Sequence, residues 1–153
     1  MKRSTWLLVV LSAVAAVTAP SGTTAARPAQ SPLDGRWRQT AAVTTQELVA
    51  RGMPPKMAAT APKLEKPALD FNAGRFRVFD LASGRTIGAG RYAVTERSVR
   101  VVFTSAPSIK PLVGRVSWLR WSVYRDRLTF SAMPGRDGSA LLPWKVHPWT
   151  RVR

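Results

Sequence analysis

The stretch VSWLRWSVYRDRLTFSA, residues 116–132, decides the fold. Two segments rich in β-branched and aromatic residues, 116–124 and 128–132, flank the polar residues 125–127. So short a polar connection between two such segments predicts a tight β-hairpin. The sequence therefore predicts antiparallel strands at this point of the chain.

Similar segments recur at short intervals on both sides of this hairpin. Upstream they occupy residues 33–40, 69–71, 75–79, 86–94 and 98–104, and downstream the residues at 143–153 can close a sheet. Turn-forming residues at 72–74 and 82–84 separate them. Within one segment, Gly88 and Gly90 predict a bend or bulge. Seven or eight short strands at regular spacing predict a mainly β protein with one antiparallel barrel or sandwich.

The hydrophobic period changes once, just after the first predicted strand. Thr44 and Glu47 form a capping-box motif, and Gly52 ends the pattern, so one short helix is expected there. The proline-rich stretch 53–67 is expected to be an irregular linker with a single helical turn near 56–60. A polar, glycine-rich loop is expected at 133–142.

The first 26 residues have the layout of a secretory signal peptide. Lys2 and Arg3 precede an uncharged apolar run at 6–17, and small residues end the segment at Ala26. A membrane span needs about 20 apolar residues, so the run is short for an anchor. We therefore expect a signal peptide at 1–26, a short leader at 27–32 and one domain at 33–153. The expected location is extracellular or in the cell envelope.

The charge of the chain is strongly unbalanced. Lysine and arginine number 24 against eight acidic residues, a formal net charge of +16. Removal of residues 1–26 would take away two basic residues, leaving 22 against eight and a net charge of +14. Such a charge favours anionic partners such as an envelope surface. Because the charges are scattered and coding bias also enriches arginine, we expect no specific nucleic-acid partner.

No set of residues in the sequence has the pattern of a catalytic or metal centre. Cysteine is absent, which excludes thiol nucleophiles, zinc–thiolate sites and disulfides. His147 is the single histidine, and one imidazole cannot build a catalytic triad or a histidine zinc site. The turn positions of Asp80, Asp126 and Asp137 are explained by turn chemistry. We expect no enzyme activity and no cofactor.

The triplet Gly35-Arg36-Trp37 resembles the G-x-W signature of the lipocalin and calycin group. The order of the later pieces is similar to a lipocalin-like domain of secreted actinobacterial proteins: GRF at 74–76, G-x-Y at 90–92, SVYRDRLTF at 122–130 and HPWTRVR at 147–153. The resemblance implies a lipocalin-like barrel in which Trp37 packs across the closed end and a late arginine, Arg151 or Arg153, stacks on it. Gly35, Trp37 and Arg151 are accordingly expected to be structural.

Aromatic residues of the predicted strands are the candidates for a ligand site. Strand alternation puts Trp121 and Tyr124 on opposite faces of one strand. If the face that carries Trp121 points inward and the barrel is hollow, Trp121 would line a cavity with Phe76, Tyr92 and Phe103, although small barrels are often packed solid.

The sequence leaves two functions open for what we expect to be a monomer. One is a secreted barrel that binds a small apolar ligand or serves as an envelope-associated accessory domain. The alternative is a basic adhesion module that holds anionic cell-wall or membrane surfaces.

Overall fold

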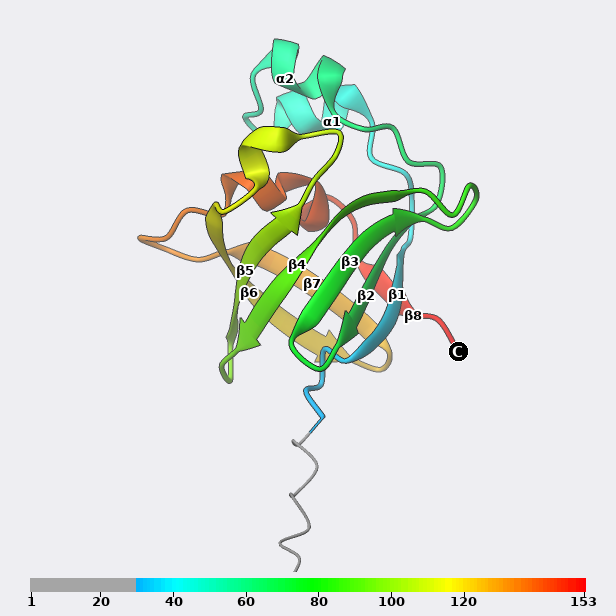
Figure 1. Ribbon diagram of the computed structural model, residues 1–153, viewed down its shortest axis with the longest axis vertical. Helices are drawn as coiled ribbons and strands as arrows, with labels where there is room; N and C mark the ends of the chain where they lie inside the picture. Colours follow the sequence, from blue (N-terminus) through cyan, green and yellow to red (C-terminus); the bar gives the residue numbers. More distant parts are fainter. Residues whose placement is uncertain (1–29) are drawn as a thin grey trace, which may run out of the picture.

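The computed structural model describes residues 30–153 and shows a closed eight-stranded barrel (Figure 1). Every strand pairs antiparallel with the next, and the last strand pairs with the first. The strands are β1 (Gly35–Gln39), β2 (Pro67–Asn72), β3 (Arg75–Asp80), β4 (Thr86–Val94), β5 (Ser98–Ser105), β6 (Val116–Tyr124), β7 (Arg127–Ala132) and β8 (Trp149–Arg151). The prediction of a mainly β, single antiparallel lipocalin-like barrel is confirmed. The predicted signal peptide at 1–26 lies outside the described residues.

The hairpin that decides the fold forms as the sequence predicts. Arg125 and Asp126 both have positive φ, at 47° and 60°, which is the backbone of a two-residue type I′ turn. This turn matches the right-handed twist of the strands and brings Tyr124 opposite Arg127. The bulge predicted at the glycines of β4 is also present, between Ala89 and Gly90.

Four short helices connect the strands, where the sequence analysis predicts one helix and a single further turn. They are α1 (Thr45–Ala50), α2 (Pro55–Thr60), η1 (Lys110–Leu112) and η2 (Ser139–Lys145). The capping box before α1 is confirmed, since the Glu47 amide donates to Thr44 Oγ1 at 3.2 Å and Glu47 Oε2 accepts from the Thr44 amide at 2.8 Å. The expected loop at 133–142 is wrong at its end, because η2 begins at Ser139.

Strand β1 begins at the end of the barrel opposite α1 and α2 (Figure 1), and the barrel is closed there around Trp37 of this strand. The indole is fully buried, and its Nε1 donates to the Leu33 carbonyl at 2.8 Å. The Arg151 guanidinium lies 4.2 Å from the ring centroid and donates to the Asp34 carbonyl at 2.8 Å. Gly35 has φ +121°, and a Cβ there would lie 2.7 Å from Arg151 Nη1, so a side chain would displace the guanidinium.

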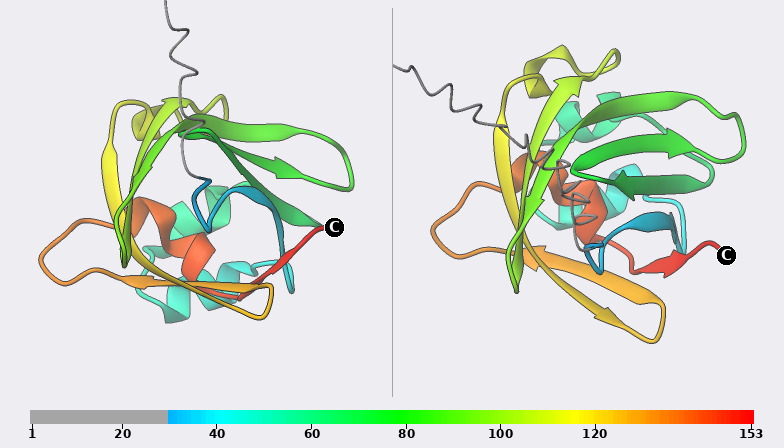
Figure 2. Two further views of the ribbon diagram at one scale, coloured as in Figure 1. Left: turned by 90° about the horizontal axis from the view of Figure 1, so that it is seen from below. Right: turned by 60° about the horizontal axis from the view of Figure 1, so that its bottom comes forward.

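The other end is closed by η2, which lies within the ring of strands in the view along the barrel (Figure 2). Its residue Trp144 is buried, and its ring centroid is 5.7 Å from that of Phe76 and 5.6 Å from that of Phe130. A separate small cluster of Leu48, Ala58 and Val146 joins α1 and α2 to the same end. Both ends of the barrel are thus covered by apolar side chains.

Candidate anion-binding face on the outside of the barrel

Three of the five predicted ligand-binding residues lie together inside the barrel, in its packed centre. Phe76, Phe103 and Tyr92 are buried, and the rings of the two phenylalanines meet edge to face at 5.0 Å. Trp144 occupies the space that these residues would offer to a ligand, with its ring centroid 6.4 Å from that of Phe103. The side chains brought together here form a core rather than an open cavity.

Tyr92 also links the core to the end of the barrel that Trp37 closes. Its hydroxyl donates to Asp34, which precedes β1. Burial, reinforced by this hydrogen bond, raises the pKa of Tyr92 far above its ordinary value. The phenol therefore stays protonated and serves as a fixed hydrogen-bond donor.

The other two predicted ligand-binding residues differ from each other, since Trp121 packs against the same core cluster and Tyr124 lies outside it. Tyr124 is 68% exposed on the outer face of β6, with the Arg125 guanidinium 5.2 Å from its ring centroid. Trp121 is half-buried, and its Nε1 donates to the carbonyls of Thr95 and Ser98 at 3.3 and 3.2 Å. These bonds fix the indole against the turn between β4 and β5.

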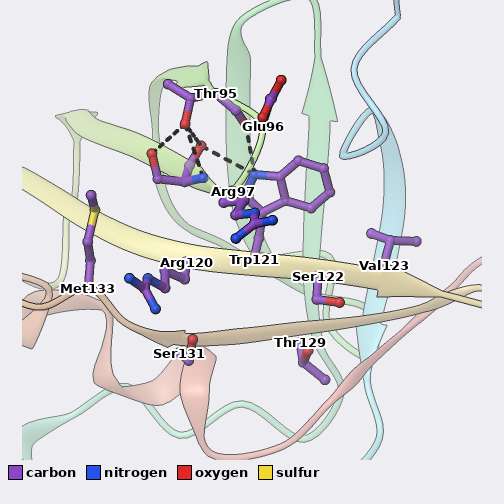
Figure 3. Close-up of a pocket in the computed structure, with 11 residues that line it drawn as sticks. Thr95, Glu96, Arg97, Arg120, Trp121, Ser122, Val123, Thr129, Ser131 and Met133 are labelled. Carbon is purple, nitrogen blue, oxygen red and sulfur yellow. Dashed lines mark hydrogen bonds between the residues drawn. The ribbon is translucent and has the colours of Figure 1, made fainter.

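An open recess of about 650 Å³ lies where this turn meets the hairpin of β6 and β7 (Figure 3). The residues that line it are Thr95, Glu96, Arg97, Ser98, Arg120, Trp121, Ser122, Val123, Thr129, Ser131 and Met133. Figure 3 shows Trp121 and Arg120 leaving β6 in opposite directions. We call the exposed hydroxyl residues Ser122, Thr129 and Ser131 the hydroxyl patch. The recess is lined by hydroxyl and charged side chains together with the apolar Trp121, Val123 and Met133.

The most distinctive feature of the outer surface is a line of arginines that crosses four strands. Arg75 on β3 lies directly opposite Arg91 on β4. Arg91 pairs with Val102, which places Arg100 on β5 diagonally beside it. Arg100 pairs with Trp118, which places Arg120 on β6 diagonally beside it in turn. All four side chains are exposed, and we call them the arginine row.

No acidic residue lies on β4, β5, β6 or β7. Among residues 30–153, the arginine row forms no ion pair, and Asp70, Asp126 and Asp137 pair with other arginines. Glu96, in the turn between β4 and β5, lines the same recess as Arg120 without forming an ion pair with it. Like charges placed directly opposite each other across two strands repel, so the pair of Arg75 and Arg91 lowers the stability of the folded protein when no anion is bound. An anion held between them would relieve that repulsion.

The neighbouring face over β1, β2 and β3 has the opposite character. There Asp70 lies between Arg36 and Arg77, with nitrogen–oxygen distances of 3.3 and 3.8 Å. The Arg77 guanidinium also covers the ring of Phe79, 4.3 Å from its centroid. On this face the arginines already have partners within the protein.

Two further ion pairs lie outside the strands. Asp137 accepts from Arg115 at 2.6 Å, and this hydrogen bond holds the pKa of Asp137 far below its ordinary value. Asp126 accepts from Arg153 at 2.7 Å, which likewise lowers the pKa of Asp126. Both carboxylates are therefore charged and paired at neutral pH.

Trp118 adds an aromatic group next to the arginine row. It is half-buried on the outer face of β6, directly opposite Arg100. The Arg136 guanidinium lies 5.0 Å from the ring centroid. The outer face thus combines cationic and aromatic groups at neighbouring positions, a combination that suits binding of an anion with an apolar or ring-shaped part.

The sequence analysis misses both the arginine row and Trp144. The arginines are 9 to 20 residues apart in the sequence, so no charge run reveals them. Their shared signal is an outward position in the strand alternation, but only the register makes them neighbours. For Trp144, the signal is its spacing of three residues from Leu141, a helical spacing that runs from the end of the loop expected at 133–142 into the terminal segment.

Other titratable groups in residues 30–153 do not assemble a reactive centre. His147 Nε2 lies 3.0 Å from Glu47 Oε1, so the single histidine contacts one carboxylate at the start of α1. Within the part of the chain that the structure describes, no three metal-ligating side chains gather. The same part contains no helix with the length and hydropathy to cross a membrane.

Fold and surface together define a basic, eight-stranded antiparallel barrel with a filled interior and an arginine-lined outer face. Neither the protein-family models nor the curated proteins contain a match to this sequence. The resemblance to the lipocalin-like group therefore depends on the motifs in the chain itself.

Proposed function

We propose that this chain is a secreted adhesion module that holds an anionic surface of the cell envelope through the outer face of β3 to β6. The arginine row carries the proposal, because four exposed guanidinium groups stand side by side with no acidic partner. Arginine binds phosphate and carboxylate groups in a bidentate manner, and its charge does not titrate at physiological pH. The net charge of the whole chain would add long-range attraction to an anionic partner.

Binding of a small apolar ligand inside the barrel is less well supported. Such a ligand would have to displace Trp144 from its contacts with Phe71, Phe76, Phe103 and Phe130. Well-packed interiors resist added volume, and overpacking costs about 1–3 kcal/mol or more. The outer face requires no such rearrangement.

Retention on isolated cell envelopes tests the adhesion proposal. The wild-type protein is compared with Arg91→Gln/Arg100→Gln and with the control Lys56→Gln/Lys63→Gln, which removes the same charge from exposed positions on and just after α2. We expect retention to fall with rising salt, since screening acts over about 8 Å at physiological ionic strength. We also expect the arginine variant to lose several times more retention than the lysine variant.

Equal losses in the two variants would mean that net charge alone, rather than the arginine row, causes retention. Retention that does not respond to salt would contradict an electrostatic contact altogether. Circular dichroism and thermal unfolding of both variants check the fold, which should be unchanged because all four side chains are exposed.

A further inference from the structure

The arginine row runs around the barrel rather than along a strand. Adjacent strands are about 4.8 Å apart, and diagonal neighbours across a strand pair are about 7–8 Å apart. Arg75, Arg91, Arg100 and Arg120 therefore present a cationic group on each of four successive strands. A partner that engages all four must cross the strands.

The curvature of the barrel restricts what such a partner can be. Eight strands complete a full circle, so the outward direction turns by roughly 45° from one strand to the next. Arg75 and Arg120 are separated by three such steps, so their outward directions differ by roughly 135°. The view along the barrel shows β3 to β6 following this curve (Figure 2). A flat lipid surface cannot face both ends of the row, whereas a flexible chain can follow it.

The residues around the arginine row indicate the chemistry of this flexible partner. The hydroxyl patch continues from the end of the row, since Ser131 lies directly opposite Arg120 and Thr129 opposite Ser122. Hydroxyl groups donate and accept hydrogen bonds and so match sugar or polyol hydroxyls. A single-stranded nucleic acid would instead need a series of aromatic side chains on which successive bases stack, and Trp118 supplies one such group beside Arg100.

We infer that the partner is a flexible, linear polyanion with hydroxyl-bearing repeats, which lies across β3 to β6 along the arginine row and extends over the hydroxyl patch. The inference rests on the proposed adhesion function and specifies its partner. Guanidinium groups bind phosphate and carboxylate groups equally well. The test therefore uses one polymer of each kind, a glycerol phosphate polymer for phosphate and alginate for carboxylate.

The test measures the affinity of the purified full chain for four probes at low and at physiological salt. The probes are a glycerol phosphate polymer, alginate, vesicles of phosphatidylglycerol and phosphatidylcholine, and a single-stranded oligothymidylate. The informative variants are Arg75→Gln and Arg120→Gln at the two ends of the row, with Lys56→Gln as the matched single-charge control. We expect one or both polymers to bind best and each end variant to weaken binding by about threefold to tenfold, with a shallower salt dependence.

The possible outcomes separate the inference from the proposal it rests on. If vesicles bind more tightly than both polymers, or if only one end of the row matters, the inference is overturned while adhesion to an anionic surface stands. Preference for the oligothymidylate also overturns it. If no probe binds in a salt-dependent manner, both the inference and the adhesion function are rejected. Hydroxyl-patch variants Thr129→Val and Ser131→Ala should weaken polymer binding and leave thermal unfolding unchanged.

Discussion

The two ends of the barrel are both closed by tryptophan, but in different ways. Trp37 belongs to β1 itself and bonds to Leu33, four residues away, while Arg151 covers its ring. Trp144 belongs to the short helix η2 and enters the barrel among rings from β2, β3, β5 and β7. The hydrogen bond of the first closure joins residues near in sequence, whereas the guanidinium over the ring comes from β8. The second closure depends on the assembled barrel, because its contacts come from strands spread over the whole chain.

The largest expected effect comes from removing each tryptophan in turn. Trp37→Ala should lower the free energy of unfolding by about 5 kcal/mol, since it leaves a cavity, an unpaired Leu33 carbonyl and an Arg151 with no ring to cover. Trp144→Ala should cost about 3–4 kcal/mol, because η2 can settle partly into the space left. Urea unfolding measures both values. A smaller effect at Trp37 than at Trp144 would contradict this ranking of the two ends.

A second experiment turns the Trp144 end into a ligand site. Trp144→Gly should leave an apolar cavity among Phe76, Phe103 and Phe130 that accepts indole or benzene. At about one hundred times its dissociation constant, such a ligand should restore about 2.7 kcal/mol of stability. Thermal unfolding with and without the ligand measures the shift, and the wild-type protein serves as the control. Equal stabilisation of the wild type would indicate that its barrel already has room for an apolar ligand.

A smaller effect is expected from Arg151→Lys at the other end. Lysine keeps the charge but loses the planar group that covers Trp37 while it donates to the carbonyls of Pro32 and Asp34. The expected loss is about 1–2 kcal/mol of unfolding free energy. Arg153→Lys is the matched control, since the Arg153 side chain is 87% exposed and should cost less than about 0.5 kcal/mol. Comparable losses in the two variants would argue against a special role of Arg151.

The smallest expected effect is a pH dependence at the turn between β3 and β4. The Asp80 carboxylate accepts from the Lys66 amide at 2.8 Å and from the Ser83 hydroxyl at 2.9 Å, and the bond from Lys66 is the main reason that the pKa of Asp80 is lowered. A carboxylate with a lowered pKa stabilises the fold above its unfolded pKa of about 4, and this stabilisation is lost as pH falls through the folded value. Thermal unfolding below about pH 4 should therefore depend less steeply on pH in Asp80→Asn than in the wild type. Identical slopes would show that this carboxylate contributes nothing.

Local patterns in the sequence account for much of the barrel. The hairpin around residues 125–127, the capping box of Thr44 and Glu47 and the bulge near Gly90 each depend on residues within a few positions of one another. The helix α2 forms where a single helical turn is expected near 56–60, and it begins one residue earlier, at Pro55. Four prolines suggested an irregular linker, but Pro55 occupies the first turn of the helix, where its missing amide proton is not needed.

The filled interior and the arginine row were harder to predict from the sequence. Phe76, Tyr92 and Phe103 were correctly placed on inward positions, but their alternation cannot reveal whether another segment fills the space between them. Whether Arg91 lies beside Arg100 depends on strand register, which a change of one residue in the turn between the strands would alter. The charge of the chain was evident from its composition, but its arrangement was not.

By itself, the sequence determined the strands, their inward and outward faces and the burial of an indole at Trp37, because alternation and capping act between near neighbours in the chain. Only the tertiary structure decided that Trp144 fills the barrel and that four scattered arginines form one row. Both arrangements arise from closure of the sheet, which sets the register of strands far apart in sequence and so brings their side chains together.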